Sequence, residues 1–203
     1  DGVSAIGNSA FARCTGLTSL TIPDGVSAIG NYAFAGCKSL TSLNIPDSIT
    51  SIGSYAFQNC TGFRTITVPN SVESIGLGVF QGCNSLEEII LPFIGSKRGN
   101  SGSSDAVFGH IFGYTTSSSS GTIYQYYSSY GYYYYIPASL TKVTITDETV
   151  IGYGAFYNCA KLTSLTYPNT VKQINDYAFY NCKGLISLTI PDGVSAIGNY
   201  AFA

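Results

Sequence analysis

Between residues 105 and 120 the chain contains the residue types of a serine hydrolase. Asp105 and His110 are followed by a run of serines over 117–120. A hydrolytic triad needs a serine nucleophile, a histidine base and a carboxylate that orients the histidine. No nucleophile elbow surrounds these serines, and one histidine near several serines is a frequent chance arrangement. We therefore predict that the protein is not an enzyme.

Other candidate chemical sites fail on spacing. Glu87 and Glu88 are adjacent, so on a strand they face opposite sides and cannot form a glycosidase pair. The segment Gly76-Leu77-Gly78 lacks the lysine and hydroxyl residue of a phosphate-binding loop. A column of acidic or amide residues follows prolines, which favours turn capping over calcium binding: Asp24, Asp47, Asn70, Asn169 and Asp192. The sequence therefore predicts no cofactor and no metal.

The six cysteines share one phase of an internal repeat. Their positions are Cys14, Cys37, Cys60, Cys83, Cys159 and Cys182. Stacked at this phase, their Cβ atoms would stay about 4.8 Å apart, which is too far for a disulfide at about 3.8 Å. We expect all six to be reduced and buried, as small apolar residues.

The repeat positions every other candidate residue. Its period is 23 residues, and isoleucine, phenylalanine and cysteine return in phase before and after one interruption. Such a period is typical of a solenoid, in which each turn buries its apolar face against its neighbours. Eight positions of one repeat are expected in the core: Val26, Ile29, Ala33, Phe34, Cys37, Leu40, Leu43 and Ile45.

Each repeat begins with a short strand that ends at a proline. Strand centres are predicted near Leu20, Leu43, Ile66, Ile89, Val143, Leu165 and Leu188. A Pro-Asp-Gly or similar turn follows, and then a recurring glycine, Gly30 in the clearest copy. Asn175 replaces this glycine once, which indicates a backbone corner with positive φ. The segment around Phe34 has helical spacing but is too short for more than a turn or two.

The motif L-x-x-L-x-I-P followed by V-x-x-I-G-x-x-A-F-x-x-C resembles the BspA-like, or Treponema pallidum type, leucine-rich repeat. The resemblance covers roughly 1–92 and 140–203. It implies an α/β repeat solenoid: a right-handed superhelix of about eight turns with one parallel sheet of short strands. It also implies a bacterial protein, secreted or on the cell surface, that acts as an adhesin for host matrix proteins or other cells.

An insertion over about 93–139 interrupts the repeats and holds nine of the 17 tyrosines. Its segment Asp105–Gly109 resembles part of a repeat. Surfaces of Tyr, Ser and Gly are typical of binding loops. The candidate ligand-binding tyrosines are Tyr124, Tyr126, Tyr127, Tyr130, Tyr132, Tyr133 and Tyr134. The alternative is that the insertion covers its own scaffold, because Ile90 occupies an outward strand position where other repeats carry Thr or Asn.

The outward side of the strands forms a second candidate surface, which includes Glu88 and Lys142. Its rows are rich in hydroxyl groups and nearly uncharged, which fits either solubility or a polar concave platform for protein or glycan. Only 10% of residues are charged and the net charge is −2. These values disfavour a nucleic-acid interface, and the short apolar runs disfavour membrane insertion.

We expect one leucine-rich-repeat domain over 1–203 that binds a protein partner. The alternatives are a carbohydrate-binding module that stacks sugars on tyrosine rings, or an architectural spacer without a ligand. Asp1 has the repeat phase of Asp24, and Ala203 has that of Ala35. The chain is therefore interpreted as a fragment of a longer array, with signal and anchor outside it and with end-to-end self-association through its two edges.

Overall fold

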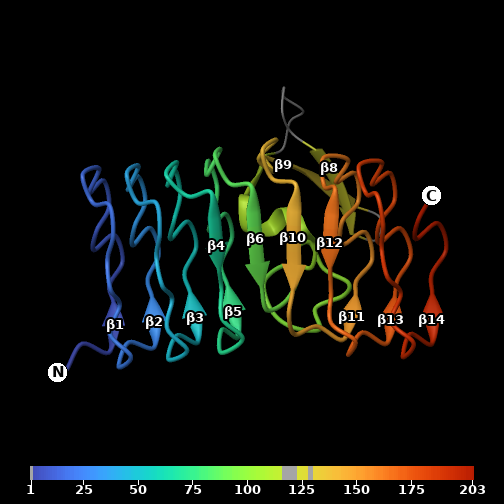
Figure 1. Ribbon diagram of the computed structural model, residues 1–203, viewed down its shortest axis with the longest axis horizontal. Helices are drawn as coiled ribbons and strands as arrows, with labels where there is room; N and C mark the ends of the chain where they lie inside the picture. Colours follow the sequence, from blue (N-terminus) through green and yellow to red (C-terminus); the bar gives the residue numbers. More distant parts are fainter. Residues whose placement is uncertain (1, 116–122, 128–129) are drawn as a thin grey trace.

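The chain forms a right-handed solenoid of about eight turns (Figure 1). The computed structural model describes residues 2–115, 123–127 and 130–203. Successive turns run side by side along one axis, with the two chain ends at opposite ends of the solenoid. The expected repeat solenoid is confirmed, and its helical part is small. One 3-10 helix, η1 (Phe108–Phe112), is the only helix in the described residues.

The predicted strands form a parallel sheet in the middle of the solenoid, which we call the front sheet. It contains β4 (Thr65–Thr67), β6 (Glu88–Leu91), β10 (Lys142–Ile145) and β12 (Ser164–Thr166), in the order β12-β10-β6-β4. Outside these four strands the ladder continues only as single parallel bridges, Thr21 with Asn44 and Ser164 with Ser187. The strand positions and their parallel direction agree with the repeat phase.

A second set of strands follows the proline turns and was not anticipated from the sequence. Each has two residues and pairs in parallel with the equivalent strand of the next turn. One sheet contains β1 (Ala5–Ile6), β2 (Ala28–Ile29), β3 (Ser51–Ile52) and β5 (Ser74–Ile75). The other contains β11 (Val150–Ile151), β13 (Gln173–Ile174) and β14 (Ala196–Ile197). The isoleucines of these strands enter the core, except Ile197 of β14, which is 49% exposed in the last turn.

The recurring glycine directly after these strands is not the predicted positive-φ corner. Positive φ occurs two residues later instead, at Tyr32 (56°) and Tyr55 (59°). A Cβ atom at Gly53 would lie 2.6 Å from the backbone nitrogen of Asn31 and 2.7 Å from the carbonyl carbon of Gly30. The expectation of a backbone corner was wrong: the close approach of neighbouring turns favours glycine at this position, although Asn175 occupies it in one turn.

The core consists of columns of identical side chains. All eight core positions predicted for the second repeat are buried. Phe34 stacks between its equivalents Phe11 and Phe57, with ring centroids 5.2 and 5.4 Å apart. Thiols support the same column, since the Sγ atom of Cys60 donates to the carbonyl of Phe34 at 3.1 Å. Stacked aromatic rings and thiol hydrogen bonds therefore repeat with the turns.

The insertion rebuilds one turn and then leaves the solenoid. The backbone N–H of Phe80 donates to Ile111 and that of Phe108 to Ala155, so η1 lies between two repeats. This agrees with the predicted resemblance of Asp105–Gly109 to a repeat. After η1, the strands β7 (Tyr114–Thr115), β8 (Ile123–Tyr127) and β9 (Tyr130–Tyr134) form an antiparallel sheet, in the order β7-β9-β8. We call these three strands the hairpin sheet.

The thiols follow the prediction except at the two edges. All six cysteines are free, and Cys37, Cys60, Cys83 and Cys159 are buried. Cys182 is half-buried and Cys14 is exposed, so the expectation that all six are buried was wrong. Among the described residues, no turn packs against the outer side of the first turn, so Cys14 is left uncovered.

Apolar side chains are exposed in the first and last turns. Val3 is 62% exposed, Ile186 86% and Phe202 45%. Packing of one copy against another through these edges stays a prediction. In the described part of the chain, no helix has the length and apolar character needed to cross a bilayer.

We call the recurring glycines, which include Gly30 and Gly53, the glycine column. The variant Gly53→Ala tests whether close approach of the turns explains it. Because the added Cβ meets backbone atoms that cannot move independently, we expect the free energy of unfolding to fall by about 1–3 kcal/mol. Gly16→Ala is the control, since its Cβ would have no atom within 4 Å, and the change should stay within about 1 kcal/mol. Urea unfolding measures both. Equal stability of the two variants would contradict the close-approach explanation.

The thiol column can be tested with a thiol reagent. Burial raises the pKa of Cys83 to about 12, and the thiolate is the reactive form. In the native protein at pH 8 we expect one fast reaction, at Cys14, with the four buried thiols reacting only after denaturation. Cys14→Ser should remove the fast phase. Rapid native labelling of Cys60 or Cys83 would refute this packing.

Candidate functional site

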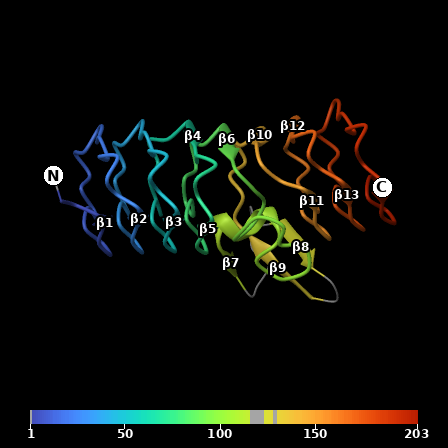
Figure 2. The ribbon, with the colours of Figure 1, turned by 90° about the horizontal axis from the view of Figure 1, so that it is seen from below.

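The hairpin sheet lies on the face of the solenoid opposite the front sheet. Figure 2 shows β7, β8 and β9 on one side of the turns and β4, β6, β10 and β12 on the other. Ile90 belongs to β6 of the front sheet and is half-buried. The tyrosines therefore do not cover Ile90, and that part of the scaffold-cover hypothesis was wrong. The hairpin sheet covers the turns that follow the short strands instead.

One glutamine fixes the hairpin sheet to the solenoid. The side chain of Gln125 is completely buried. Its Oε1 accepts from the backbone N–H of Gly109 at 2.6 Å, and its Nε2 donates to the carbonyl of Tyr157 at 3.0 Å. A nearby amide adds a further bond, from Nδ2 of Asn158 to the carbonyl of Tyr124 at 2.9 Å. A buried polar group with its partners satisfied holds its element in one place.

Gly109 and Tyr134 complete this attachment. A Cβ atom at Gly109 would clash with the ring of Tyr134, so glycine permits the close contact between η1 and β9. Tyr134 is fully buried, and its hydroxyl donates to the carbonyl of Ser104 at 3.1 Å. Tyr134 was predicted as a ligand-binding residue, and the structure places it in the core of the insertion.

The pairing of β8 with β9 divides the tyrosines between two faces. Residues paired directly across strands share a face, and Gln125 pairs with Tyr132 while Tyr124 pairs with Tyr133. Tyr132 therefore lies on the face of Gln125, toward the solenoid. Tyr124 and Tyr133 lie on the other face, with ring centroids 4.7 Å apart. We call this pair the outer tyrosine pair; both rings are half-buried.

Three of the predicted tyrosines cannot be assigned to a face by their contacts. The backbone of Tyr126, Tyr127 and Tyr130 belongs to β8 and β9, but their side chains lie outside the described part. The serines of 117–120 also fall within the residues not described, 116–122 and 128–129.

Glu88 and Lys142 form a separate group on the front sheet. They are direct neighbours on β6 and β10, in one row with Thr65 and Ser164. The predicted outward rows are therefore in register. The structure does not bring this row together with the hairpin sheet, since the two lie on opposite faces. The predicted site residues thus belong to two surfaces.

Tyrosines of the repeats form stacked pairs that were not predicted from the sequence. Tyr32 stacks on Tyr55 at 5.1 Å, and Tyr177 on Tyr200 at 5.3 Å, with interplanar angles of 14° and 16°. Burial is the main cause that raises the pKa of Tyr55. Electrostatic interactions with Tyr32 and Tyr114 raise it further. The recurrence of tyrosine at one repeat phase was the available signal. Each ring of a stacked pair covers one face of the other, and Tyr200, in the last turn, is 63% exposed.

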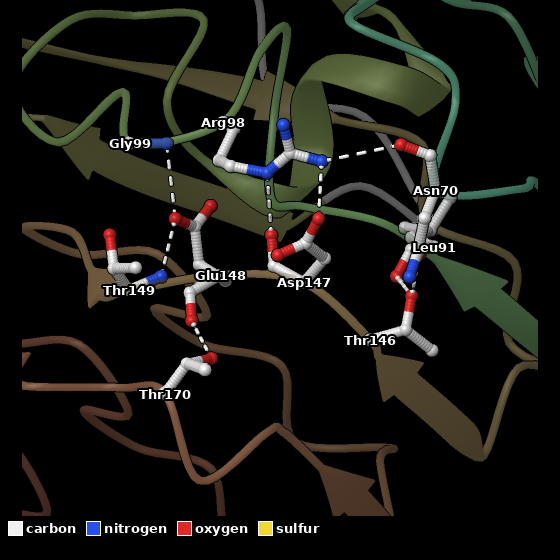
Figure 3. A network of polar contacts seen from close by, with 9 residues as sticks. All are labelled: Asn70, Leu91, Arg98, Gly99, Thr146, Asp147, Glu148, Thr149 and Thr170. Carbon is white, nitrogen blue, oxygen red and sulfur yellow. Dashed lines mark hydrogen bonds and ion pairs between the residues drawn. The ribbon is translucent and has the colours of Figure 1, made fainter. Parts of the chain in front are cut away.

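The root of the insertion is held by a polar network (Figure 3). Arg98 donates from Nε to the carbonyl of Asp147 at 3.0 Å and forms an ion pair with its carboxylate at 2.7 Å. The buried Glu148 accepts from the backbone N–H groups of Gly99 at 3.0 Å and Thr149 at 2.9 Å. Thr170 donates to the carbonyl of Glu148 at 2.7 Å. These contacts tie the insertion to the turns on its C-terminal side.

Of the candidate triad, the structure describes Asp105 and His110, whereas the serines of 117–120 lie outside the described residues. Asp105 accepts from the hydroxyl groups of Ser96, at 2.5 Å, and Ser103. His110 is buried within η1, and burial lowers its pKa. Among the described residues, the Nε2 atom of His110 has no partner, and no group of His, Cys, Asp and Glu could hold a metal ion.

Comparison with protein families matches the BspA type leucine-rich repeat region. Six copies are found, over residues 1–101 and 110–203. The match extends into both ends of the insertion, beyond the repeats recognised from their motif. The comparison with curated protein sequences gave no match.

Solved structures of bacterial leucine-rich repeat proteins resemble the chain. One from Eubacterium ventriosum is 26% identical over 91% of this chain, with a TM-score of 0.58. One from Bacteroides ovatus is 22% identical over 96%, also with 0.58, and one from Treponema pallidum is 26% identical over 97%, with 0.48. The chain spans 42%, 48% and 67% of these proteins, respectively.

The attachment of the hairpin sheet can be tested by Gln125→Ala. This change leaves the buried N–H of Gly109 without a partner, at a cost of about 1–3 kcal/mol. We expect faster amide hydrogen exchange in β8 and β9 and unchanged exchange in the front sheet. Gln58→Ala is the control, because the half-buried side chain of Gln58 forms its hydrogen bond with the side chain of Gln81. Uniformly faster exchange would show that the hairpin sheet and solenoid unfold as one unit.

Proposed function

Because the chain belongs to the BspA type leucine-rich repeat family, we propose that it is a non-enzymatic module that binds a protein partner through the insertion. The family is a repeat scaffold that generally binds proteins. Insertions in such arrays collect on one face, which is often the binding face. We further propose an adhesin-like role, at the cell surface or in a secreted protein, toward a host matrix protein or another cell.

The observation that carries the proposal is the outer tyrosine pair on a fixed support. Tyr124 and Tyr133 lie on the face of the hairpin sheet away from Gln125, which is bonded to the scaffold. A surface that is already ordered loses less entropy when it binds a partner. Tyrosine adds a large, rigid and amphipathic contact area, and such rings often dominate the energy of an interface.

Sugar stacking on tyrosine rings is the weaker alternative. A sugar packs against the open face of a ring, whereas Tyr124 and Tyr133 contact each other, with centroids 4.7 Å apart, and both are half-buried. The remaining alternative, a spacer with no ligand, predicts that removing the outer tyrosine pair changes no binding. One experiment therefore separates the three functions.

The test is the double variant Tyr124→Ser with Tyr133→Ser. We expect binding to immobilised fibronectin or fibrinogen to weaken by at least about tenfold, since each anchor ring can contribute about 2 kcal/mol. The melting temperature should change little, because both rings lie on the outer face. Binding is measured by surface plasmon resonance and stability by calorimetry, with a glycan array in parallel.

Tyr32→Ser is the matched control, since Tyr32 is 42% exposed and Ser9 occupies the same repeat phase with the same positive φ. It should leave binding unchanged. Unchanged binding of the double variant together with a sharply lower melting temperature would identify the insertion as scaffold cover. Binding confined to glycans would favour the carbohydrate module.

A further inference from the structure

A groove lined by both polar and apolar residues crosses the short strands of the N-terminal half. Its volume is about 490 Å³, which is within the range of ligand sites in proteins. It runs over four successive turns and ends at the insertion. Side chains of hydrogen-bonding type line it: Asn8, Asn31, Ser51, Ser54, Ser74, Ser96, Lys97 and Asp105.

The groove is open because the residues of its floor are small. The outward residues of β2, β3 and β5 are Ala28, Ser51 and Ser74, and the glycine column follows each strand. The isoleucines of the same strands are buried in the core. The close approach of the turns, which favours glycine, therefore also leaves a shallow channel across them.

Two asparagine side chains along the channel are held in place, and several polar groups there make no hydrogen bond to other residues that the structure describes. The Oδ1 atom of Asn8 accepts from the backbone N–H of Asn31 at 2.7 Å, and that of Asn31 accepts from Ser54 at 2.8 Å. These bonds hold each amide in place. Within the described residues, the amide nitrogens of Asn8 and Asn31 and the hydroxyl groups of Ser51 and Ser74 make no hydrogen bond.

The insertion closes one end with two opposite charges. Lys97 is exposed, and Asp105 is held by the hydroxyl groups of Ser96 and Ser103. Burial raises the pKa of Asp105, but hydrogen bonds from Ser103, Ser96 and Asn100 outweigh it and lower the pKa to about 2. The end of the groove thus offers a carboxylate acceptor and an ammonium donor. This combination disfavours a polyanion as much as a polycation.

We propose that this groove binds a neutral, extended oligosaccharide. Vicinal hydroxyl groups both donate and accept, which matches the mixed amide, hydroxyl, carboxylate and ammonium groups of the groove. The groups recur with the spacing of the turns, about 4.8 Å, so one linear chain reaches several of them. A peptide is less suited, because peptide recognition uses an open strand edge or apolar side-chain pockets. β2 and β3 are paired on both sides, so neither offers an open edge to a peptide.

This site is independent of the proposed protein-binding surface. None of its lining residues belongs to the hairpin sheet. The two proposals can therefore fail separately, and the outer tyrosine pair serves as a control for the groove.

The test is titration of the full 203-residue chain with neutral β-linked hexasaccharides. Cellohexaose, xylohexaose and mannohexaose are used, with a hyaluronan hexasaccharide as the anionic comparison. We expect at least one neutral hexasaccharide to bind, by calorimetry and by amide chemical shift changes centred on Ser51, Ser74 and Ser96. Ser74→Tyr, which fills the floor, and Asp105→Asn should each weaken binding by at least about tenfold.

Two controls make the result decisive. Ser42→Tyr adds the same ring at an exposed serine outside the groove and should leave affinity unchanged. The Tyr124→Ser, Tyr133→Ser variant should also bind normally. The proposal is overturned if no neutral hexasaccharide binds at millimolar concentration, if only hyaluronan binds, or if Ser74→Tyr binds as well as the unmodified chain. Loss of binding in the tyrosine variant alone would place the glycan on the hairpin sheet.

Discussion

Backbone hydrogen bonds between neighbouring turns are the constraint on which the rest of the structure depends. The N–H of Phe34 donates to Ala56 at 2.8 Å, and that of Gly53 donates to Ile29 at 2.8 Å, so turns are joined well beyond the front sheet. Because each bond repeats at the same phase, identical side chains stack into columns of phenylalanine and cysteine. The same spacing would place a Cβ at Gly53 or Gly76 against the backbone of the preceding turn. The distance between neighbouring turns therefore determines the core packing, the positions of the glycines and the groove across the short strands.

The first part of the insertion keeps the same distance to its neighbouring turns before the chain leaves the solenoid. It does so through η1, whose residues accept from Gly78 and Phe80 on one side while Phe108 donates to Ala155 on the other. The polar network of Arg98 and Glu148 then ties its first loop to the following turns. Only after this turn is complete does the hairpin sheet diverge, and Gln125 brings it back against the scaffold. A tyrosine-rich segment is thereby ordered without disturbing the columns.

The repeat phase was enough to predict the core columns, the strand positions and the parallel register, since every copy repeats the same local signal. The two-residue strands could not be predicted, because a period of two cannot be recognised in two residues. Gln125 was also missed: its role comes from contacts with Gly109 and Tyr157, which are distant in sequence. The position of the recurring glycine was predicted correctly, but the reason for it was not. Both a close approach of the backbone and a positive φ favour glycine, so the sequence alone does not separate them. The placement of the hairpin sheet depends on tertiary contacts alone.

The identity of residues 19–35 with 187–203 bears on how the position of the insertion along the solenoid can change. Each turn has the same two packing faces, so one 23-residue unit can be gained or lost without altering its neighbours' contacts. Every such change would translate the hairpin sheet along the axis by about 4.8 Å, adding only the small rotation of one turn. The number of repeats on one side of the insertion therefore determines the position of the hairpin sheet along the solenoid axis, in equal steps of one turn.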